Sequence, residues 1–180
     1  FNAMLKTLEP TRSAREESYF ITRRQHLYKL ESRWIQSDVA HFTYYAQRGM
    51  EEKTAKLSNE WLKLAMRLVD GQFCSDIERD WMESIQVHYN EQILKILERV
   101  AQNYVRLQEF DKVIRWAERI IALDEGHEEG YRLLMLAHYY LGNRREALKQ
   151  YERCVNVLDE QYKITPMDPT EQLYELVLKM

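Results

Sequence analysis

Glycine, proline and cysteine are all scarce in this chain. Its 180 residues include 5 Gly, 3 Pro and 2 Cys, while 45% of the residues are hydrophobic and 31% are charged. This composition is typical of a folded, helix-rich domain and argues against a disordered chain. Cys74 and Cys154 lie far apart and form no CxxC pair. We therefore expect reduced thiols in a cytoplasmic protein.

Long apolar runs are also absent. No stretch of about 18 apolar residues occurs, and the N-terminal segment lacks the apolar core of a signal peptide. The sequence therefore predicts no transmembrane helix and no membrane partner.

Recognisable catalytic and metal-binding motifs are missing as well. The five histidines are scattered, without an HExxH motif or a pair at i, i+4, and no glycine-rich phosphate loop or GxSxG motif occurs. We predict a protein that is not an enzyme, with no catalytic residue, no metal site and no cofactor. An α-helical enzyme, the reading we favour least, would need a polar, convergent cleft with perturbed ionisable groups.

The net charge of −3 does not suggest a nucleic-acid binder, but the charge is unevenly distributed. Residues 1–33 contain seven basic and four acidic residues, a net charge of +3, which leaves −6 for the rest of the chain. Such asymmetry can mark a nucleic-acid-facing piece joined to an acidic interaction piece, although ordinary surface variation explains it equally well.

The stretch from Ile93 to Leu158 contains two copies of one pattern. Tyr104–Gln108 aligns with His138–Gly142, and Val113 then falls on Ala147. A period of about 34 residues, as between these copies, is the length of a tetratricopeptide repeat, a helix–turn–helix unit that stacks on its neighbours. We expect the repeat core to be formed by Leu97, Val100, Tyr104, Val113, Ala117, Ile120, Leu134, Ala147, Tyr151 and Val155.

The tetratricopeptide pattern also implies a partner-binding groove. Its inner positions fall in the first copy on Lys95, Glu98, Gln102, Val105 and Arg106, and in the second on Glu129, Arg132, Leu136, Tyr139 and Tyr140. This mixture suits a polar peptide or another protein surface. The alternative is that neighbouring helices of the same chain fill the groove.

The segment ahead of the repeat predicts a β-hairpin followed by helices. Ser18–Thr22 and Leu27–Leu30 are rich in β-branched and aromatic residues, with the polar Arg23–His26 between them. Apolar stripes at helical spacing begin at Ile35, with Gly49 as the expected end of the first helix.

The remaining helices can be placed from their capping signals. Ser75–Glu78 is a capping box that opens a pattern running to Leu107, either one long helix or two with a kink. Three helices follow, and Asp168-Pro169 starts a short final one. The predicted fold is all-α: a tetratricopeptide-like helical repeat of about seven helices, with a short N-terminal β-hairpin.

Taken together, these landmarks resemble the bacterial transcriptional activator domain of SARP-type regulators, preceded by the end of an OmpR-like winged helix. Leu5–Pro10 is similar to the end of a recognition helix, and Tyr19–Arg24 with Leu27–Leu30 to the wing hairpin. The later landmarks are Ser37–Phe42, Asp80-Trp81, Gly142–Arg144, Ala147–Tyr151, Ile164–Pro166 and Glu171–Tyr174. Two departures are the wing turn, which lacks glycine, and Gln108, which stands where the first repeat's turn favours a small residue.

The resemblance implies a domain division and a role. Residues 1–33 would be the remnant of a winged-helix DNA-binding domain and residues 34–180 the helical-repeat activator domain, so we expect the chain to be a fragment of a longer regulator. DNA would be bound only through the full-length protein's winged helix, with candidate backbone contacts at Arg12, Arg15, Arg23, Arg24 and Lys29.

In this family the helical repeats serve dimer contacts, signal input or contacts with the transcription machinery. The expected partner is therefore another protein or a second copy of the chain, as a homodimer. The alternative is a free-standing tetratricopeptide-type adaptor that binds a peptide, although such an adaptor has no need of a basic hairpin.

Overall fold

The computed structural model describes residues 21–25, 27–30, 37–69 and 80–179. It divides into two compact units, Phe1–His41 and Phe42–Met180. Ser75–Glu78, the expected capping box, lies outside the described residues, as does Cys74.

The described strands of the first unit form the expected hairpin. Strands β1 (Ile21–Arg24) and β2 (Leu27–Leu30) pair antiparallel, with Ile21 opposite Leu30 and Arg24 opposite Leu27. The prediction that the turn would begin at Arg23 was wrong, because Arg23 and Arg24 belong to the first strand. Gln25, which follows that strand, has a φ of 56°, the left-handed conformation that tight hairpin turns require.

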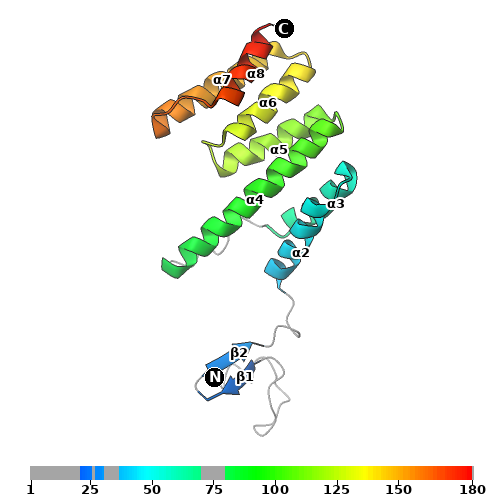
Figure 1. Cartoon of the computed structure of the whole chain (residues 1–180), viewed down its shortest axis with the longest axis vertical. Helices are drawn as coiled ribbons and strands as arrows, with labels where there is room; N and C mark the ends of the chain where they lie inside the picture. Colours follow the sequence, from blue (N-terminus) through cyan, green and yellow to red (C-terminus); the bar gives the residue numbers. More distant parts are fainter. Residues whose placement is uncertain (1–20, 26, 31–36, 70–79, 180) are drawn as a thin grey trace. The chain divides into compact units, whose positions relative to one another are not determined.

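Seven α-helices and one π-helical turn follow within the described part of the chain (Figure 1). This confirms the all-α fold with about seven helices. Their bounds are α2 (Asp38–Glu51), α3 (Ala55–Met66), α4 (Asp80–Arg106), α5 (Phe110–Leu123), α6 (Glu128–Tyr140), α7 (Arg144–Val157), η2 (Leu158–Tyr162) and α8 (Asp168–Leu178). The sequence pattern up to Leu107 was compatible with one long helix or two. From Asp80 to Arg106 it forms a single helix, α4.

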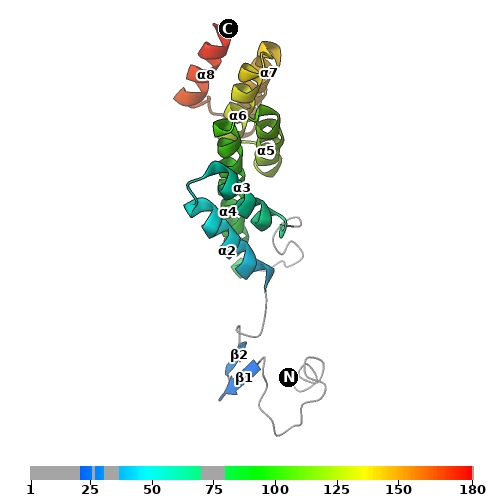
Figure 2. The same cartoon turned by 90° about the vertical axis from the view of Figure 1, so that its right-hand side faces the viewer.

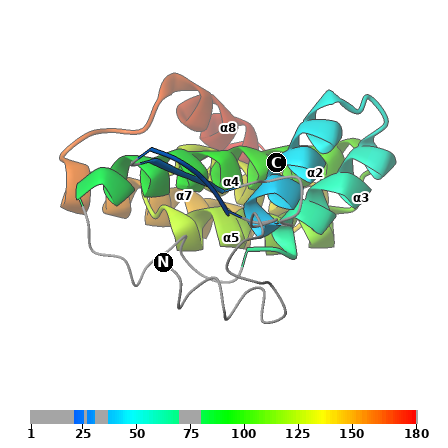
Figure 3. The same cartoon turned by 90° about the horizontal axis from the view of Figure 1, so that it is seen from below.

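The two predicted repeats are the hairpins α4–α5 and α6–α7, and α8 takes the place of the first helix of a third. Helix α8 contacts α6 and α7, just as α6 contacts α4 and α5. Figures 2 and 3 show α5 and α7 on one side of α4 and α8 on the other. The fold therefore keeps the two-layer arrangement of a helical repeat, with α8 beside the layer that contains α4 and α6.

The core runs continuously through these hairpins. Eight of the ten expected core residues are buried, including Leu97, Val100 and Ala117. Two predictions were wrong, because Tyr151 and Val155 are only half-buried. The neighbouring Cys154 takes the core position in place of Val155, while Tyr151 stacks on Tyr174 of α8 with ring centroids 3.9 Å apart.

Helices α2 and α3 join this core through a close backbone approach and a buried polar bridge. Gly49 does not end α2 as predicted, because α2 continues to Glu51. Gly49 instead lies against Leu62, where an added Cβ would stand 2.4 Å from Leu62 Cδ2. The amide of Asn103 on α4 donates to Ser58 Oγ and to Asn59 Oδ1, both at 2.9 Å, and so ties α3 to the repeat.

The turns of both hairpins have the same backbone geometry despite different residues. Gln108 has a φ of 57° and Gly142 a φ of 74°. In the first turn the N–H of Glu109 donates to Tyr104 O at 3.0 Å; in the second the N–H of Asn143 donates to His138 O at 2.8 Å. This is the bonding of a Schellman helix end, in which glycine is the favoured left-handed residue. Gln108 therefore adopts the repeat's turn against its own conformational preference.

Truncation of Leu97 tests the continuity of the core. Leu97 on α4 is 2% exposed, so Leu97→Ala removes buried methyl groups and leaves a cavity. We expect a loss of about 2–5 kcal/mol in the free energy of unfolding, measured by urea denaturation. Leu57→Ala is the matched control, because Leu57 is 46% exposed, and it should cost less than about 1 kcal/mol. Equal losses for the two variants would contradict the assignment.

A reciprocal exchange at the two turns tests the left-handed geometry. Gly142→Ala should destabilise the chain by about 1–2 kcal/mol, the usual cost of this conformation, although an added Cβ meets nothing within 4 Å. Gln108→Gly should stabilise it by about 0.5–1 kcal/mol. Glycine adopts the left-handed conformation without steric cost, and this gain in free energy exceeds the free-energy cost of ordering the more flexible glycine backbone. Thermal unfolding measures both, and a destabilised Gln108→Gly variant would show that the side chain matters more than the backbone.

Candidate partner-binding site

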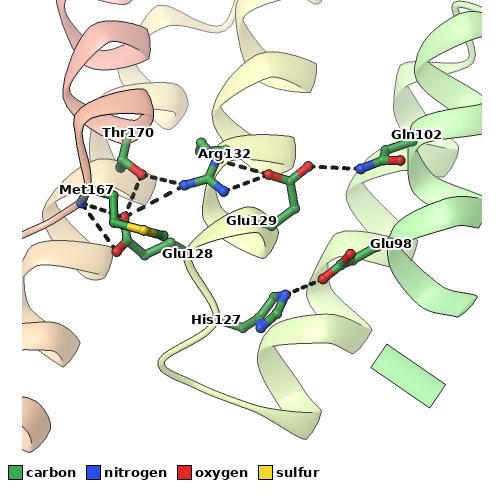
Figure 4. Close-up of polar contacts among 8 residues, drawn as sticks. All are labelled: Glu98, Gln102, His127, Glu128, Glu129, Arg132, Met167 and Thr170. Atoms are coloured by element: carbon green, nitrogen blue, oxygen red, sulfur yellow. Dashed lines mark hydrogen bonds and ion pairs between the residues drawn. The ribbon is translucent and has the colours of Figure 1, made fainter. Parts of the chain in front are cut away.

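A cavity of about 620 Å³ lies where α4, the start of α6 and the α7–α8 connection meet. Residues that surround it or hold its walls together are drawn in Figure 4. Its lining combines charged side chains from the two repeats with apolar side chains of the connection. The residues are Glu98, Gln102, Gly126, His127, Glu128, Glu129, Arg132, Leu158, Ile164, Thr165 and Met167.

The cavity coincides with a break in the repeat period. Helices α5 and α7 begin one period apart, at Phe110 and Arg144. Helices α6 and α8, which begin at Glu128 and Asp168, are separated by six residues more than that. The additional residues fall in the π-helical turn η2 and in residues 163–167, and Lys163 ends η2 in a left-handed conformation with a φ of 56°. This longer connection supplies four of the lining residues.

The carboxylate of Glu128 holds the far end of this connection in place. Its side chain is only 5% exposed. Thr170 Oγ1 donates to Glu128 Oε2 at 2.6 Å, and the Met167 N–H donates to the two carboxylate oxygens at 3.0 and 3.3 Å. Arg132 Nη1 lies 3.8 Å from Glu128 Oε2. A buried carboxylate is stable only with such donors, so it fixes the first turn of α8 against α6.

A second set of contacts links α4, α6 and α8 across the cavity wall. Arg132 donates from Nε to Glu129 Oε2 at 2.9 Å, and its Nη2 lies 2.8 Å from the same oxygen. Its Nη1 donates to Thr170 Oγ1 at 2.9 Å. On the other side, Gln102 Nε2 donates to Glu129 Oε1 at 3.2 Å. One arginine and one glutamate therefore connect all three helices, as Figure 4 shows.

His127 and Glu98 close the cavity at the α5–α6 loop. His127 Nε2 lies 2.5 Å from Glu98 Oε1, and its Nδ1 lies 3.7 Å from Asp124 Oδ2. The hydrogen bond to Glu98 raises the pKa of His127, opposed by partial burial and helped by the nearby charges of Glu98, Asp124 and Glu129. The folded chain thus favours the imidazolium form more strongly than a free histidine side chain does.

The arrangement offers hydrogen-bonding and charged groups beside apolar ones. The carboxylates of Glu128 and Glu129 are held by donors, and the cavity presents a mixture of charged, amide and apolar groups. Among the described residues, no group of three His, Cys, Asp or Glu side chains is placed to hold a metal ion. The helices in the described ranges are too short or too polar for any of them to cross a membrane.

Four of the ten predicted groove residues come together in the cavity. Glu98 and Gln102 reach it from α4, and Glu129 and Arg132 from α6. The other six do not line it. Lys95 and Arg106 are exposed on α4, and Val105 is half-buried against the core.

The remaining three predicted positions lie on α6, outside the cavity lining. Leu136 and Tyr139 are half-buried, and Tyr140, 58% exposed, stacks on Phe110 with ring centroids 4.7 Å apart. Sequence reasoning missed the contributions of the α7–α8 connection, because a regular repeat has no such insertion. The sequence signal for this insertion was the spacing between the starts of α6 and α8, which exceeds one repeat period.

Of the five candidate DNA-contact residues, three lie within the described part of the chain. Arg12 and Arg15 lie outside the described residues. Arg23 and Arg24 are on β1 and Lys29 is on β2, so the hairpin joins the three in one small sheet. Thr22 is opposite Lys29, and Tyr28 is opposite Arg23.

The described helices of the second unit form a helical-repeat domain with a cavity at its irregular connection. Its sequence matches the bacterial transcriptional activator domain family over residues 37–178, and the chain belongs to this family. It is therefore an activator domain of a transcriptional regulator.

Among solved structures, the chain is similar to that of EmbR from Mycobacterium tuberculosis, determined in complex with a low-affinity phosphopeptide. The TM-score is 0.77 at 18% sequence identity, with 89% of the present chain and 43% of the EmbR chain covered. The likeness shows a shared fold, and the present chain spans less than half of that protein. No curated protein sequence matches the chain.

The raised pKa of His127 predicts a pH-dependent stability. Because Glu98 favours the charged imidazole, this pair stabilises the fold fully below the ordinary histidine pKa of about 6.5, and the contribution is lost as pH rises through the raised pKa of the folded state. Urea denaturation should therefore show less loss of stability between about pH 6 and pH 9 for His127→Gln than for the unaltered chain.

Two further variants separate this pair from other titrating groups. Glu98→Gln should flatten the pH dependence in the same way, because it removes the charge that His127 faces. His88→Gln, which replaces an exposed histidine of α4, is the matched control. Identical pH profiles for the His127 variant and the unaltered chain would contradict the ion pair.

Proposed function

We propose that the helical unit receives a protein contact at the cavity and couples it to a DNA-binding domain of the same regulator. The observation that carries this proposal is the convergence of Glu98, Gln102, Glu129 and Arg132, from two successive repeats, on one cavity. Its volume of about 620 Å³ lies within the usual range for binding pockets. A contact there touches α4, α6 and the connection to α8 together.

Coupling requires a DNA-binding partner domain, for which the N-terminal segment is the candidate. We assign residues 1–33 to the end of a winged-helix domain and residues 34–180 to the activator domain. The basic residues of the β1–β2 hairpin, Arg23, Arg24 and Lys29, support this assignment, because a wing contacts phosphates while a helix reads base edges.

The partner at the cavity is a protein segment, from another protein or from a second copy of this chain. EmbR, which shares the fold, has been determined with a phosphopeptide, so a protein that contains this fold takes part in peptide recognition. A free-standing adaptor is the second candidate. It would use the same cavity and would have no use for the basic hairpin.

Reporter activation and promoter occupancy, measured together in the full-length regulator, test the proposal. Ile164→Ser combined with Gln102→Ala should lower activation on the order of tenfold, as expected for a lost contact worth about 1.4 kcal/mol, and leave promoter occupancy unchanged. Ala substitutions at Arg23, Arg24 and Lys29 should instead reduce occupancy. Glu118→Gln, on the exposed face of α5, is the control and should change neither.

Each half of the proposal has its own contrary result. Full activation by the cavity variant would show that the cavity does not receive the activating contact. Unchanged occupancy after loss of the three basic residues would favour the adaptor.

A further inference from the structure

The cavity is bordered by apolar side chains that the fold leaves exposed. Ile164 and Met167, both in the α7–α8 connection, are 52% and 53% exposed. They lie in the connection that exceeds the repeat period, so the segment that lengthens the chain here also carries an apolar rim. Binding pockets typically combine apolar lining side chains with a few polar groups, as this cavity does.

The electrostatics of the cavity indicate what docks there. Its lining contains the carboxylates of Glu98, Glu128 and Glu129 against the single guanidinium of Arg132. The net charge of the lining is therefore −2 with a neutral His127, and −1 with a protonated one. Arg132 is already shared between Glu128 and Glu129, at 3.8 and 2.8 Å. Since Arg132 offsets only one of these two carboxylates, the remaining negative charge is divided between them and Glu98. A protonated His127 offsets the charge of Glu98.

We propose that the cavity accepts a lysine or arginine side chain of a protein partner, with apolar neighbours of that residue packed on Ile164 and Met167. This rests on the proposed function of the cavity as a protein-contact site. A long basic side chain complements both parts of the surface, because its aliphatic stem packs on apolar atoms while its cationic head meets carboxylates.

The same charges disfavour an acidic or phosphorylated partner here. A phosphate group would face a lining in which three carboxylates outnumber the single guanidinium of Arg132, so like-charge repulsion disfavours it. The Gln102 amide and the Thr165 hydroxyl, which also line the cavity, can orient the partner's backbone by hydrogen bonds.

Fluorescence anisotropy of the whole chain with short fluorescein-labelled peptide pools tests the proposal. Each pool has randomised apolar flanks and one fixed central residue: Lys, Arg, Gln, norleucine, Glu or phosphothreonine. The Lys and Arg pools should bind at least about tenfold more tightly than the Gln and norleucine pools, a difference of about 1.4 kcal/mol. The Glu and phosphothreonine pools should bind most weakly, and added salt should reduce the preference.

Three variants locate the binding. Glu98→Gln combined with Glu129→Gln should abolish the preference for the basic pools, because it removes two negative charges and keeps amide oxygens in their place. Ile164→Ser should weaken the binding of the Lys and Arg pools. It should leave the fold intact, because Ile164 is 52% exposed. Glu146→Gln, which removes an acid paired with Lys149 outside the cavity, is the matched control and should behave like the unaltered chain.

The outcomes separate this inference from the proposed function on which it rests. If neutral or acidic pools bind best and Ile164→Ser weakens them, the basic partner is overturned while the cavity remains a protein-contact site. If binding of the basic pools is unaffected by every cavity variant, or if no pool binds, the cavity is not the site and both fail. A charge preference that disappears only in the Glu98 and Glu129 variant supports the proposal.

Discussion

Helix α4 has to be covered on two faces, and the rest of the helical unit follows from that requirement. Ile96, Leu97 and Val100 are almost fully buried in the middle of this one helix. Helix α3 covers it on one side and α5 on another, and α6 also reaches it. A single hairpin cannot bury such a helix, so stacking of successive hairpins is the condition under which α4 is stable in water. The cavity lies at the place where this stacking loses its regular spacing.

The apolar pattern was sufficient to predict the fold, because burial repeats with the same period as the sequence. Val113 and Ala147, which occupy equivalent positions in the two copies, are both fully buried. The local errors arose where tertiary contacts, and not the local preference of a residue, decide its role. Gly49 was taken as a helix end because glycine favours ends, whereas it is needed for the close approach of Leu62. Such an approach depends on a residue distant in sequence, which local pattern cannot indicate.

The candidate site was only partly predictable, for a related reason. Glu98, Gln102, Glu129 and Arg132 were found because inner positions of a helical repeat recur at fixed spacing. Glu128 and Thr170 were missed, although they anchor α8 through a hydrogen bond of 2.6 Å. Their pairing crosses an irregular connection, so no periodic rule relates them. Periodicity predicts the regular structure, and an excess over the period reveals the longer connection, but the contacts that this connection makes cannot be predicted in this way.

The shared turn geometry at Gln108 and Gly142 has a consequence for how such chains change length. The hydrogen bonds that end α4 and α6 join backbone atoms alone, so the turn forms even where glycine is replaced, at the conformational cost that Gln108 carries. A duplicated or deleted unit of one period would therefore arrive with its turn already able to form, and later substitutions could accumulate within it. The connection before α8 lacks this interchangeability, because a buried carboxylate fixes it to one particular partner helix. Insertion of a further helical hairpin is thus compatible with the turns between helices of a hairpin, and incompatible with the connection beside the cavity.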